Sequence, residues 1–353
     1  MKKSHFNVIG VMSGTSLDGI DIAFVNFTKD KTWSYKFLNT KTVEYPKKWV
    51  KKLKNLINEP FRNVEIEDDS YTLFLAKQIN NFILDNNLQD VDAICSHGHT
   101  IFHEPKKGLT YQIGNKKTLA IKTGIKLICD FRKQDVALGG QGAPLVPIGD
   151  KLLFRNFDSC LNLGGFANLS QNIDDKILAY DICAVNTVLN HLSNKRGELL
   201  DFNGKGAKRG NFIPSFFNIL EGFDYYTQKG PKSLGLEWVK FNIYPIIRSH
   251  ENNTIEDLLH TYTIHIAKQI GSKFKNKEKV LVTGGGAKNL FLINEIKNYS
   301  SARFFIPSNE LIDFKEALIF GFLGVLRLRD EINCLASVTG SSKDHCSGII
   351  YTP

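Results

Sequence analysis

The sequence predicts an α/β protein made of two copies of one kind of domain, with a ligand bound between the halves. Residues 8–23 read as a short apolar strand, a turn rich in glycine and small hydroxyls, and a second apolar strand. Residues 157–180 repeat that order about 150 residues later, roughly one domain length. Residues 280–298 predict a buried strand that passes through glycines into a helix, as at a nucleotide-binding corner.

The turn of the first hairpin, GTSLDG at 14–19, suits a phosphate group. Its backbone N–H groups and small hydroxyls can surround an anion, and Asp18 and Asp21 can hold a metal ion or a polarised water. It is not a Walker P-loop, because no Gly-Lys-Ser/Thr follows and the next element is a strand. An ordinary edge hairpin with a polar turn explains the segment equally well, so the segment alone leaves both interpretations open.

Helical and strand patterns alternate after each hairpin. Apolar residues at helical spacing predict a helix over 69–86, and short apolar runs predict strands at 91–95 and 126–129, each followed by a polar cluster. In open α/β sheets ligands bind at the carboxyl ends of strands, so both clusters are candidates for the site. In the second half, helices are predicted over 254–272 and 315–330.

The composition is that of a soluble globular protein. The 353 residues are 42% hydrophobic and 23% charged, with a formal net charge of +9. The lysines are dispersed and lack interleaved aromatic residues, so we expect no nucleic-acid partner. No apolar run approaches the roughly 18–20 residues that cross a bilayer, so we expect no membrane partner. Six scattered cysteines without a CxxC pair, and no secretory signal, predict a reduced, cytoplasmic chain.

The densest block of glycines and polar residues is RKQDVALGGQGAPLVP at 132–147. Its three glycines allow the backbone to approach a ligand closely. Asp135 lies at the mouth of this block and is placed to act as a general base, a role typically worth about 10²–10⁴-fold in rate. The alternative is a surface carboxylate that pairs locally with Arg132.

Three histidines, His97, His99 and His103, follow the strand at 91–95. Strand spacing places the first two on one face, which would suit zinc, but no nearby cysteine completes a site. A loop whose imidazoles hydrogen-bond a sugar or order the site fits better than a metal site.

The chain resembles the anhydro-N-acetylmuramic acid kinase family, within the superfamily of sugar kinases, heat-shock-70 proteins and actin. The matching segments occur in the family's order from Val8 to Gly340. They are GVMSGTSLDGID at 10–21, SHGHT at 96–100, YQIG at 111–114, DFRKQDVALGGQGAPLVP at 130–147, NLGGFANLS at 162–170, PKSLG at 231–235, VTGGGAKN at 282–289, KEALIFGFL at 315–323 and SVTG at 337–340. The long block at 130–147, combined with the segment at 10–21, makes the resemblance specific.

The resemblance implies two actin-like (ribonuclease H-like) α/β domains, with mixed sheets flanked by helices and a nucleotide cleft between them. We place the domains at 1–143 and 144–353, with the last helix, about 315–330, packing back on the first. The implied activity is ATP-dependent phosphorylation of 1,6-anhydro-N-acetylmuramic acid with opening of the anhydro bridge. The product is N-acetylmuramic acid 6-phosphate, formed in peptidoglycan recycling. The resemblance also allows a homodimer.

The resemblance implies roles for individual residues as well. ATP phosphates are expected to bind Gly14, Thr15, Ser16, Leu17, Asp18, Gly19, Ile20 and Asp21. To this nucleotide site we add the glycines of the second hairpin and of the strand–helix corner, which are Gly164, Gly165, Gly284, Gly285 and Gly286. Asp18 is the expected Mg²⁺ ligand. The family's catalytic aspartate maps onto Asp135. The predicted substrate-binding set is His97, Thr100, Arg132, Gln141 and Glu316.

The chain departs from the family pattern on the substrate side. Many members have Asp-Thr-Gly-Pro-Gly-Asn where this chain has DICAVN at 181–186, Thr-Gly-Arg where it has LGL at 234–236, and Gln where it has His99. These changes concern recognition of the lactyl group or of a peptide remnant. They leave the nucleotide site largely untouched.

Two alternative functions belong to the same superfamily. A kinase for another sugar or acid would transfer phosphate to a free hydroxyl without ring opening. A nucleotide-switched chaperone or filament protein would hydrolyse ATP slowly without a small-molecule acceptor, and would need a peptide-binding domain or polymer contacts.

Overall fold

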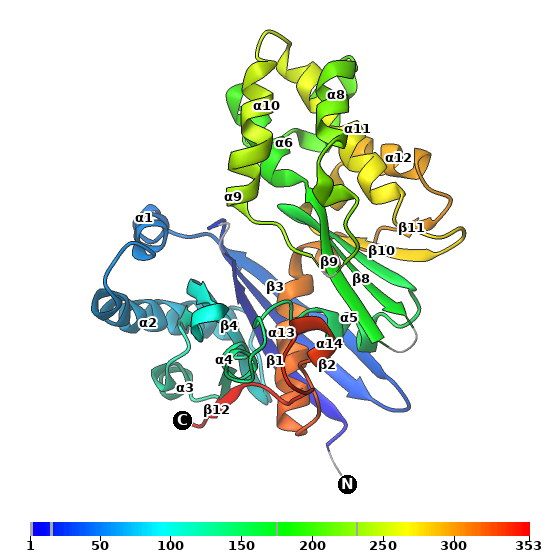
Figure 1. The fold of residues 1–353 in the computed structure, drawn as a ribbon. Helices are drawn as coiled ribbons and strands as arrows, with labels where there is room; N and C mark the ends of the chain where they lie inside the picture. Colours follow the sequence, from blue (N-terminus) through cyan, green and yellow to red (C-terminus); the bar gives the residue numbers. More distant parts are fainter. Residues whose placement is uncertain (1–2, 15–16, 174–175, 231) are drawn as a thin grey trace. The chain divides into compact units, whose positions relative to one another are not determined.

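The structure is a computed structural model that describes residues 3–14, 17–173, 176–230 and 232–353. Contacts within the chain divide it into two compact units (Figure 1). Unit 1 consists of Met1–Leu153 and Phe314–Pro353, and unit 2 consists of Phe154–Asp313. Within the described residues, no helix is long and apolar enough to span a bilayer.

Unit 1 is built on a seven-stranded mixed sheet. Its strands are β1 (His5–Ser13), β2 (Ile20–Lys29), β3 (Trp33–Val43), β4 (Ala93–Glu104), β5 (Leu109–Ile113), β6 (Leu127–Cys129) and β12 (Ile349–Tyr351). The order is β12-β6-β4-β1-β2-β3, with β5 paired to β4 outside this path. The three strands β1, β2 and β3 form an antiparallel meander, whereas β1, β4 and β6 are parallel neighbours.

The helices of unit 1 cover both faces of the sheet. They are α1 (Lys47–Leu56), α2 (Phe61–Asp85), α3 (Lys117–Thr123), α4 (Lys133–Ala137), α5 (Pro147–Leu153), α14 (Ala336–Thr339) and most of α13 (Asn309–Leu328). Alternate residues of β1 point to opposite faces. Ile9 and Val11 lie in the same buried cluster as Leu75 of α2, whereas Val8 and Gly10 face Gly321 of α13.

Helix α13 packs closely against the first strands of unit 1, which it crosses in Figure 1. The ring of Phe322 lies 5.4 Å from Phe27 and 5.1 Å from Trp33, measured between centroids. At Gly10 the helix comes so near that a Cβ atom would lie 2.0 Å from the carbonyl oxygen of Ala317. Glycine at position 10 therefore permits this helix to dock directly on the strand.

The two units differ from the domain ranges 1–143 and 144–353 that we place from the sequence. Helix α5 and the segment from Phe314 onward belong to unit 1. Their packing explains this, because Lys315 Nζ of α13 lies 2.8 Å from Asp150 Oδ1 of α5. A chain that returns to its first unit cannot be divided correctly by a single cut in the sequence.

Unit 2 contains a five-stranded sheet in the order β11-β10-β7-β8-β9. Its strands are β7 (Ser159–Leu163), β8 (Phe166–Ile173), β9 (Lys176–Ala184), β10 (Lys279–Thr283) and β11 (Arg303–Phe305). Its helices are α6 (Asn186–Lys195), α7 (Lys205–Arg209), α8 (Pro214–Glu221), α9 (Leu236–Trp238), α10 (Tyr244–Ser249), α11 (Ile255–Gly271) and α12 (Leu290–Asn298). The buried cluster of this unit joins the sheet to α6, α11 and α12.

The two sheets share one topology. In each, the first three strands form an antiparallel meander, and the first, fourth and fifth strands of the pattern are parallel neighbours. Strands β7, β8, β9, β10 and β11 thus repeat the arrangement of β1, β2, β3, β4 and β6. This repeat confirms the predicted class of two actin-like α/β domains with mixed sheets flanked by helices. The nucleotide cleft between them stays a prediction.

One local prediction was wrong. We expected the histidine segment after 91–95 to be a loop, but β4 continues to Glu104. The reason is the neighbouring strand β5, which pairs with β4 from His99 to Glu104. Hydrogen bonding to a partner that follows in the sequence thus extends a strand whose polar composition suggests a loop.

Candidate active site in unit 1

The first hairpin places its polar turn between β1, which ends at Ser13, and β2, which begins at Ile20. Leu17 has a positive φ of 61°, and its N–H donates to the Gly14 carbonyl oxygen at 3.3 Å. Asp18 is exposed, whereas Asp21 is half-buried. The Thr42 hydroxyl donates to Asp21 Oδ1 at 2.6 Å. Thr15 and Ser16, which we assign to ATP binding, lie outside the described residues.

A buried hydroxyl network lies directly beneath this turn. Ser13 Oγ lies 2.5 Å from the hydroxyl of Tyr45, 2.8 Å from that of Tyr71 and 3.0 Å from His99 Nδ1. Burial raises the pKa of both tyrosines and lowers the pKa of His99 to about 4. The network is therefore neutral at pH 7, and it fixes the end of β1 from which the turn departs.

Acid is expected to destabilise the protein through His99. The unfolded side chain takes up a proton below its ordinary pKa of about 6.5, whereas the folded one stays neutral until about pH 4. Unfolding therefore becomes easier as the pH falls from about 6.5 to 4, by roughly 2–3 kcal/mol from this group. Urea unfolding of wild type and His99→Gln across this range checks it. If the free energy of unfolding falls with pH in the variant as steeply as in wild type, His99 contributes nothing to the acid sensitivity.

Asp135 is fully buried, with 0% of its surface exposed. It lies in α4, and its oxygens accept from three donors. The Gly142 N–H donates to Oδ2 at 2.7 Å, while the Thr339 hydroxyl and the Cys334 thiol donate to Oδ1 at 2.6 and 3.1 Å. These three hydrogen bonds fix the orientation of the carboxylate. The Gly140 backbone also lies against it, since a Cβ there would be 2.1 Å from Oδ2.

The C-terminal segment supplies neighbours of Asp135 that sequence reasoning missed. Cys334 and Thr339 bond to the carboxylate, and His345 Nε2 lies 3.7 Å from Oδ1. The SVTG segment at 337–340 carries a signal for Thr339. The sequence has no comparable signal for Cys334 or His345, because only tertiary packing brings residues about 200 positions apart to one carboxylate.

Arg132 does not pair directly with Asp135. Its Nε donates to His97 Nε2 at 3.0 Å, and its Nη1 donates to the Gly142 carbonyl at 2.6 Å. The other His97 nitrogen, Nδ1, donates to the Gly98 carbonyl at 2.8 Å. Burial lowers the pKa of Arg132 to about 10, against the opposing effect of Glu316. The guanidinium therefore links His97 of β4 to the glycine block.

Glu316, on α13, adds a carboxylate to the same region of unit 1. Its side chain reaches solvent, yet the protein around it desolvates the carboxylate and raises its pKa. The charge of Arg132 opposes this rise, and the charges of Asp21 and Asp18 add to it. Glu316 thus lies within electrostatic reach of Arg132 and of the first hairpin.

Thr100 and Gln141, two further residues that we assign to substrate binding, make fewer contacts than Arg132 or Asp135. Thr100 is half-buried on β4, and its Oγ1 accepts from Gln112 Nε2 at 3.4 Å. The Gln141 side chain is exposed, while its N–H donates to the Thr339 carbonyl at 2.8 Å. Both residues lie in unit 1, and Gln141 contacts Thr339, a neighbour of Asp135. Their roles in substrate binding stay predictions.

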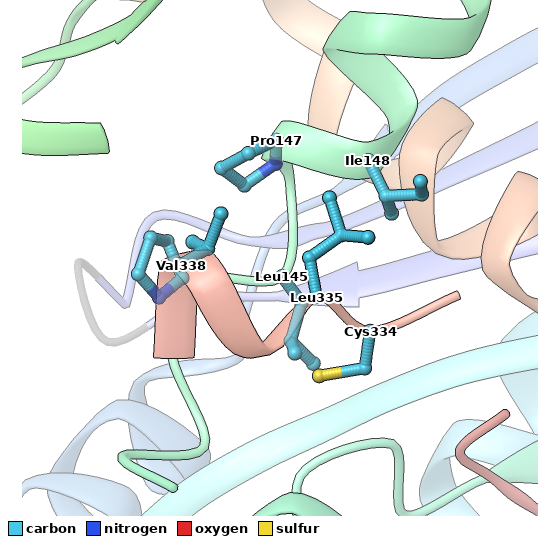
Figure 2. Close-up of a pocket in the computed structure, with 7 residues that line it drawn as sticks. Leu145, Pro147, Ile148, Cys334, Leu335 and Val338 are labelled. Atoms are coloured by element: carbon cyan, nitrogen blue, oxygen red, sulfur yellow. The ribbon is translucent and has the colours of Figure 1, made fainter. Parts of the chain in front are cut away.

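A small hollow lies on the Cys334 side of the site (Figure 2). It encloses about 150 Å³, which includes open solvent, and has no room for the centre of a water-sized molecule. Its lining residues are Pro144, Leu145, Pro147, Ile148, Cys334, Leu335 and Val338. These side chains are apolar apart from the thiol, so the hollow offers few of the hydrogen-bonding groups that a sugar requires.

In unit 2 the two predicted glycine turns lie side by side. They follow β7 and β10, which are parallel neighbours with Asn162 opposite Thr283. A Cβ at Gly284 would lie 2.6 Å from Asn162 Oδ1, and one at Gly286 would lie 2.8 Å from Leu163 Cβ. The Gly164 and Gly165 carbonyls accept the N–H groups that begin α6, among them that of Val185 at 2.8 Å. The residues that we assign to nucleotide binding therefore belong to two groups. One is the first hairpin of unit 1, and the other is the pair of glycine turns in unit 2.

The two segments of unit 2 that depart from the family pattern contact each other. The Leu234 N–H donates to Asp181 Oδ2 at 2.8 Å, and the Tyr225 hydroxyl donates to the Asp181 carbonyl at 2.7 Å. Burial raises the pKa of Asp181. The changes at 181–186 and 234–236 thus belong to one local structure rather than to two unrelated sites.

Comparison with known proteins identifies the family of this chain. A model of the family described as anhydro-N-acetylmuramic acid kinase matches residues 6–353. The Pseudomonas fluorescens protein of that name is 33% identical, over 97% of this chain and 98% of its own length. That of Mannheimia succiniciproducens is 32% identical, over 99% and 100%.

Among solved structures, component A of (R)-2-hydroxyglutaryl-CoA dehydratase from Acidaminococcus fermentans is 12% identical, with a TM-score of 0.47. That match covers 89% of this chain and 95% of the other. The sequence matches extend over nearly the whole length of both partners, and they include every segment around Asp135. This chain belongs to the anhydro-N-acetylmuramic acid kinase family.

Proposed function

We propose that this chain uses ATP to phosphorylate 1,6-anhydro-N-acetylmuramic acid at O6 and opens its anhydro bridge by hydrolysis. The products are N-acetylmuramic acid 6-phosphate and ADP, and the role is peptidoglycan recycling. Membership of the family supports this reaction. The observation that carries it is the environment of Asp135, a buried carboxylate held by the glycine block in the unit that also bears the first hairpin.

The chemistry of the substrate explains why a base is needed. In the anhydro sugar O6 is bonded to C1 and carries no proton, so it cannot accept phosphate as a free hydroxyl does. We assign Asp135 to remove a proton from the water that attacks C1. The C1–O6 bond then breaks, O6 bonds to the γ-phosphorus, and the bond from that phosphorus to ADP breaks. Attack opposite the bridge resembles inverting glycoside hydrolysis.

The donors around Asp135 suit this role in one respect and restrict it in another. They hold the carboxylate oxygens in a fixed orientation, which a positioned base requires. However, a side chain with 0% exposure has no contact with solvent. Water can reach it only after the cover moves, and the segment at 139–142, with positive φ at Gly139 and Gly142, lies against it. We therefore expect the reaction to require local opening of this cover.

Arg132 and His97 have distinct roles in this proposal. Both ring nitrogens of His97 already have partners, Arg132 and the Gly98 carbonyl. We therefore assign His97 to positioning Arg132 rather than to contact with the sugar. Arg132 retains further N–H donors for the carboxylate of the lactyl group. Glu316, whose pKa is raised, is suited to hydrogen-bond a sugar hydroxyl.

The hairpin of unit 1 and the glycine turns of unit 2 are the proposed ATP contacts. The exposed Asp18 carboxylate, together with Asp21, offers the oxygen ligands that Mg²⁺ prefers. When bound, Mg²⁺ would neutralise charge on the phosphates. A homodimer and a cytoplasmic location stay predictions.

Incubation with ATP, Mg²⁺ and 1,6-anhydro-N-acetylmuramic acid in ¹⁸O-water tests the proposal. We expect a 6-phosphorylated sugar that carries ¹⁸O at C1, because the attacking oxygen comes from water and the bridge oxygen stays on C6. Mass spectrometry of the product, with fragmentation to place the label, provides the measurement.

Two controls make the result decisive. Free reducing sugars exchange their C1 oxygen with water, so unlabelled product incubated for the same time sets the background. A phosphorylated sugar whose bridge is intact would instead indicate a superfamily kinase that acts on a free hydroxyl. ATP hydrolysis that is unchanged by the sugar would favour the nucleotide-switched alternative and overturn the proposal.

A further inference from the structure

A cysteine and a histidine that have no part in the proposed reaction form a buried cluster with Asp135. The ligand atoms of Asp135, Cys334 and His345 all lie within 4.8 Å of one another. Among the described residues, this is the one group of three or more such side chains that could hold a metal ion. The histidines of β4 form no such group there.

The backbone holds the two C-terminal residues of this cluster together. Cys334 and His345 form an isolated antiparallel bridge, in which the N–H of each donates to the carbonyl of the other at 3.1 Å. Asp135 approaches from α4, where Gly142 and Thr339 fix its orientation. Backbone and side-chain hydrogen bonds therefore hold all three residues of the cluster in place, as a ligand site requires.

His345 has a buried ring nitrogen without a hydrogen-bond partner. Its Nδ1 lies 3.1 Å from the Lys343 carbonyl, which can only accept, so Nδ1 donates to that carbonyl. Nε2 faces Asp135 Oδ1 at 3.7 Å, which is too far for a hydrogen bond. The buried Nε2 atom has no hydrogen-bond partner, although only 3% of the side chain is exposed. A cation bound between His345 Nε2 and Asp135 Oδ1 would give the buried nitrogen a partner.

The donor set determines which cation fits. A thiol, an imidazole and a carboxylate are the ligands of zinc, which takes them at about 2.0–2.3 Å in tetrahedral sites. Mg²⁺ prefers six oxygen ligands and is excluded by the sulfur and nitrogen. Burial and the charge of Asp135 raise the pKa of Cys334. Metal binding displaces that thiol proton, while the same negative surroundings favour a divalent cation.

We propose that Asp135, Cys334 and His345 form a zinc site, and that zinc bound there stops the reaction by engaging the catalytic base. The existence of the site does not depend on the proposed function, whereas its inhibitory effect rests on it. With zinc bound, Asp135 would donate its lone pair to the metal and could not take a proton from water. The site would thus make the enzyme sensitive to free zinc.

Cobalt titration of the full chain tests the site without any assay of activity. Wild type is expected to show thiolate-to-cobalt charge-transfer absorption that one equivalent of zinc abolishes and excess Mg²⁺ does not. Cys334→Ser should lose this absorption, and His345→Gln should bind at least about 10-fold more weakly. Cys346→Ser, a neighbouring thiol outside the cluster, is the matched control and should behave as wild type. Circular dichroism verifies that each variant is folded.

An assay of phosphoryl transfer then separates the two parts of the proposal. Zinc should inhibit wild type and Cys346→Ser reversibly, with recovery on chelation, whereas His345→Gln should resist it. Charge-transfer absorption that persists in Cys334→Ser, or is absent from wild type, would overturn the site. Normal cobalt spectra with no inhibition would overturn the inhibitory effect alone. A wild type that has the spectra but does not phosphorylate the anhydro sugar would contradict the proposed function and leave the site standing.

Discussion

Replacement of Asp135 by asparagine is expected to leave the protein folded and able to bind nucleotide while turnover falls by about 10²–10⁴-fold. The amide has nearly the shape of the carboxylate but cannot accept a proton from water. It can turn its oxygen toward the Gly142 N–H and its NH₂ group toward the Thr339 hydroxyl oxygen, which keeps most of the buried contacts. Steady-state kinetics of sugar phosphorylation, with nucleotide affinity from calorimetry, provide the measurement.

Asp68→Asn is the matched control for this experiment. Asp68 is also buried in unit 1, and it too accepts from a backbone N–H, that of Gly114 at 2.7 Å, and from hydroxyls, those of Tyr111 and Thr72. The two substitutions should therefore cost similar stability, but only Asp135→Asn should lose turnover. Equal kcat values for the two variants would remove Asp135 from the role of base.

Gly10→Ala is expected to destabilise unit 1 by about 3 kcal/mol or more, at the upper end of the range for overpacked cores. The new Cβ would lie 2.0 Å from the Ala317 carbonyl oxygen and 2.9 Å from its carbon. These are backbone atoms of α13, so relief requires the whole helix to move away from β1. Because α13 also carries Glu316, this movement should impair turnover as well. Urea denaturation of wild type and variant measures the loss.

Gly321→Ala tests whether close approach, rather than loss of a glycine, is responsible. This residue faces Gly10 from the helix, but a Cβ there would meet its nearest atoms, on Phe27 and Val8, at 3.5 Å. That is ordinary contact, and alanine favours a helix interior over glycine by about 1 kcal/mol. We expect Gly321→Ala to be as stable as wild type or more so. If Gly10→Ala unfolds at the wild-type urea concentration, the direct docking of α13 on β1 is not a constraint.

Much of the fold follows from local sequence patterns. Periodicity and glycine spacing correctly locate three features. These are the strands of both hairpins, helix α11, and the corner at which β10 passes through glycines into α12. The repeat of one hairpin pattern predicts the duplicated domain, which the five-strand order common to the two sheets bears out. Such features need only the alternation of apolar residues and the freedom of glycine, both of which are properties of short segments.

Local patterns do not predict the limits of the two units or the β4 extension, and the packing of the last helix on the first domain is expected only from the family resemblance. Helix α13 belongs mostly to unit 1, although it is separated from β1 by about 300 residues of sequence, since Gly10 and Phe27 receive it. The histidine segment is a strand because β5 follows and pairs with it. Both outcomes depend on packing or pairing partners elsewhere in the chain. The composition of the segment itself carries no information about those partners.

By itself, the sequence determined that this protein is a duplicated α/β protein with a glycine-rich first hairpin and a glycine block around Asp135, and it indicated the family. Tertiary structure alone decided what surrounds that carboxylate. Thr339, Cys334 and His345 reach Asp135 only because the chain returns to unit 1 after α13. A local pattern can identify a carboxylate suited to catalysis. Its burial, its hydrogen bonds and its neighbouring ligands depend on which distant segments pack against it.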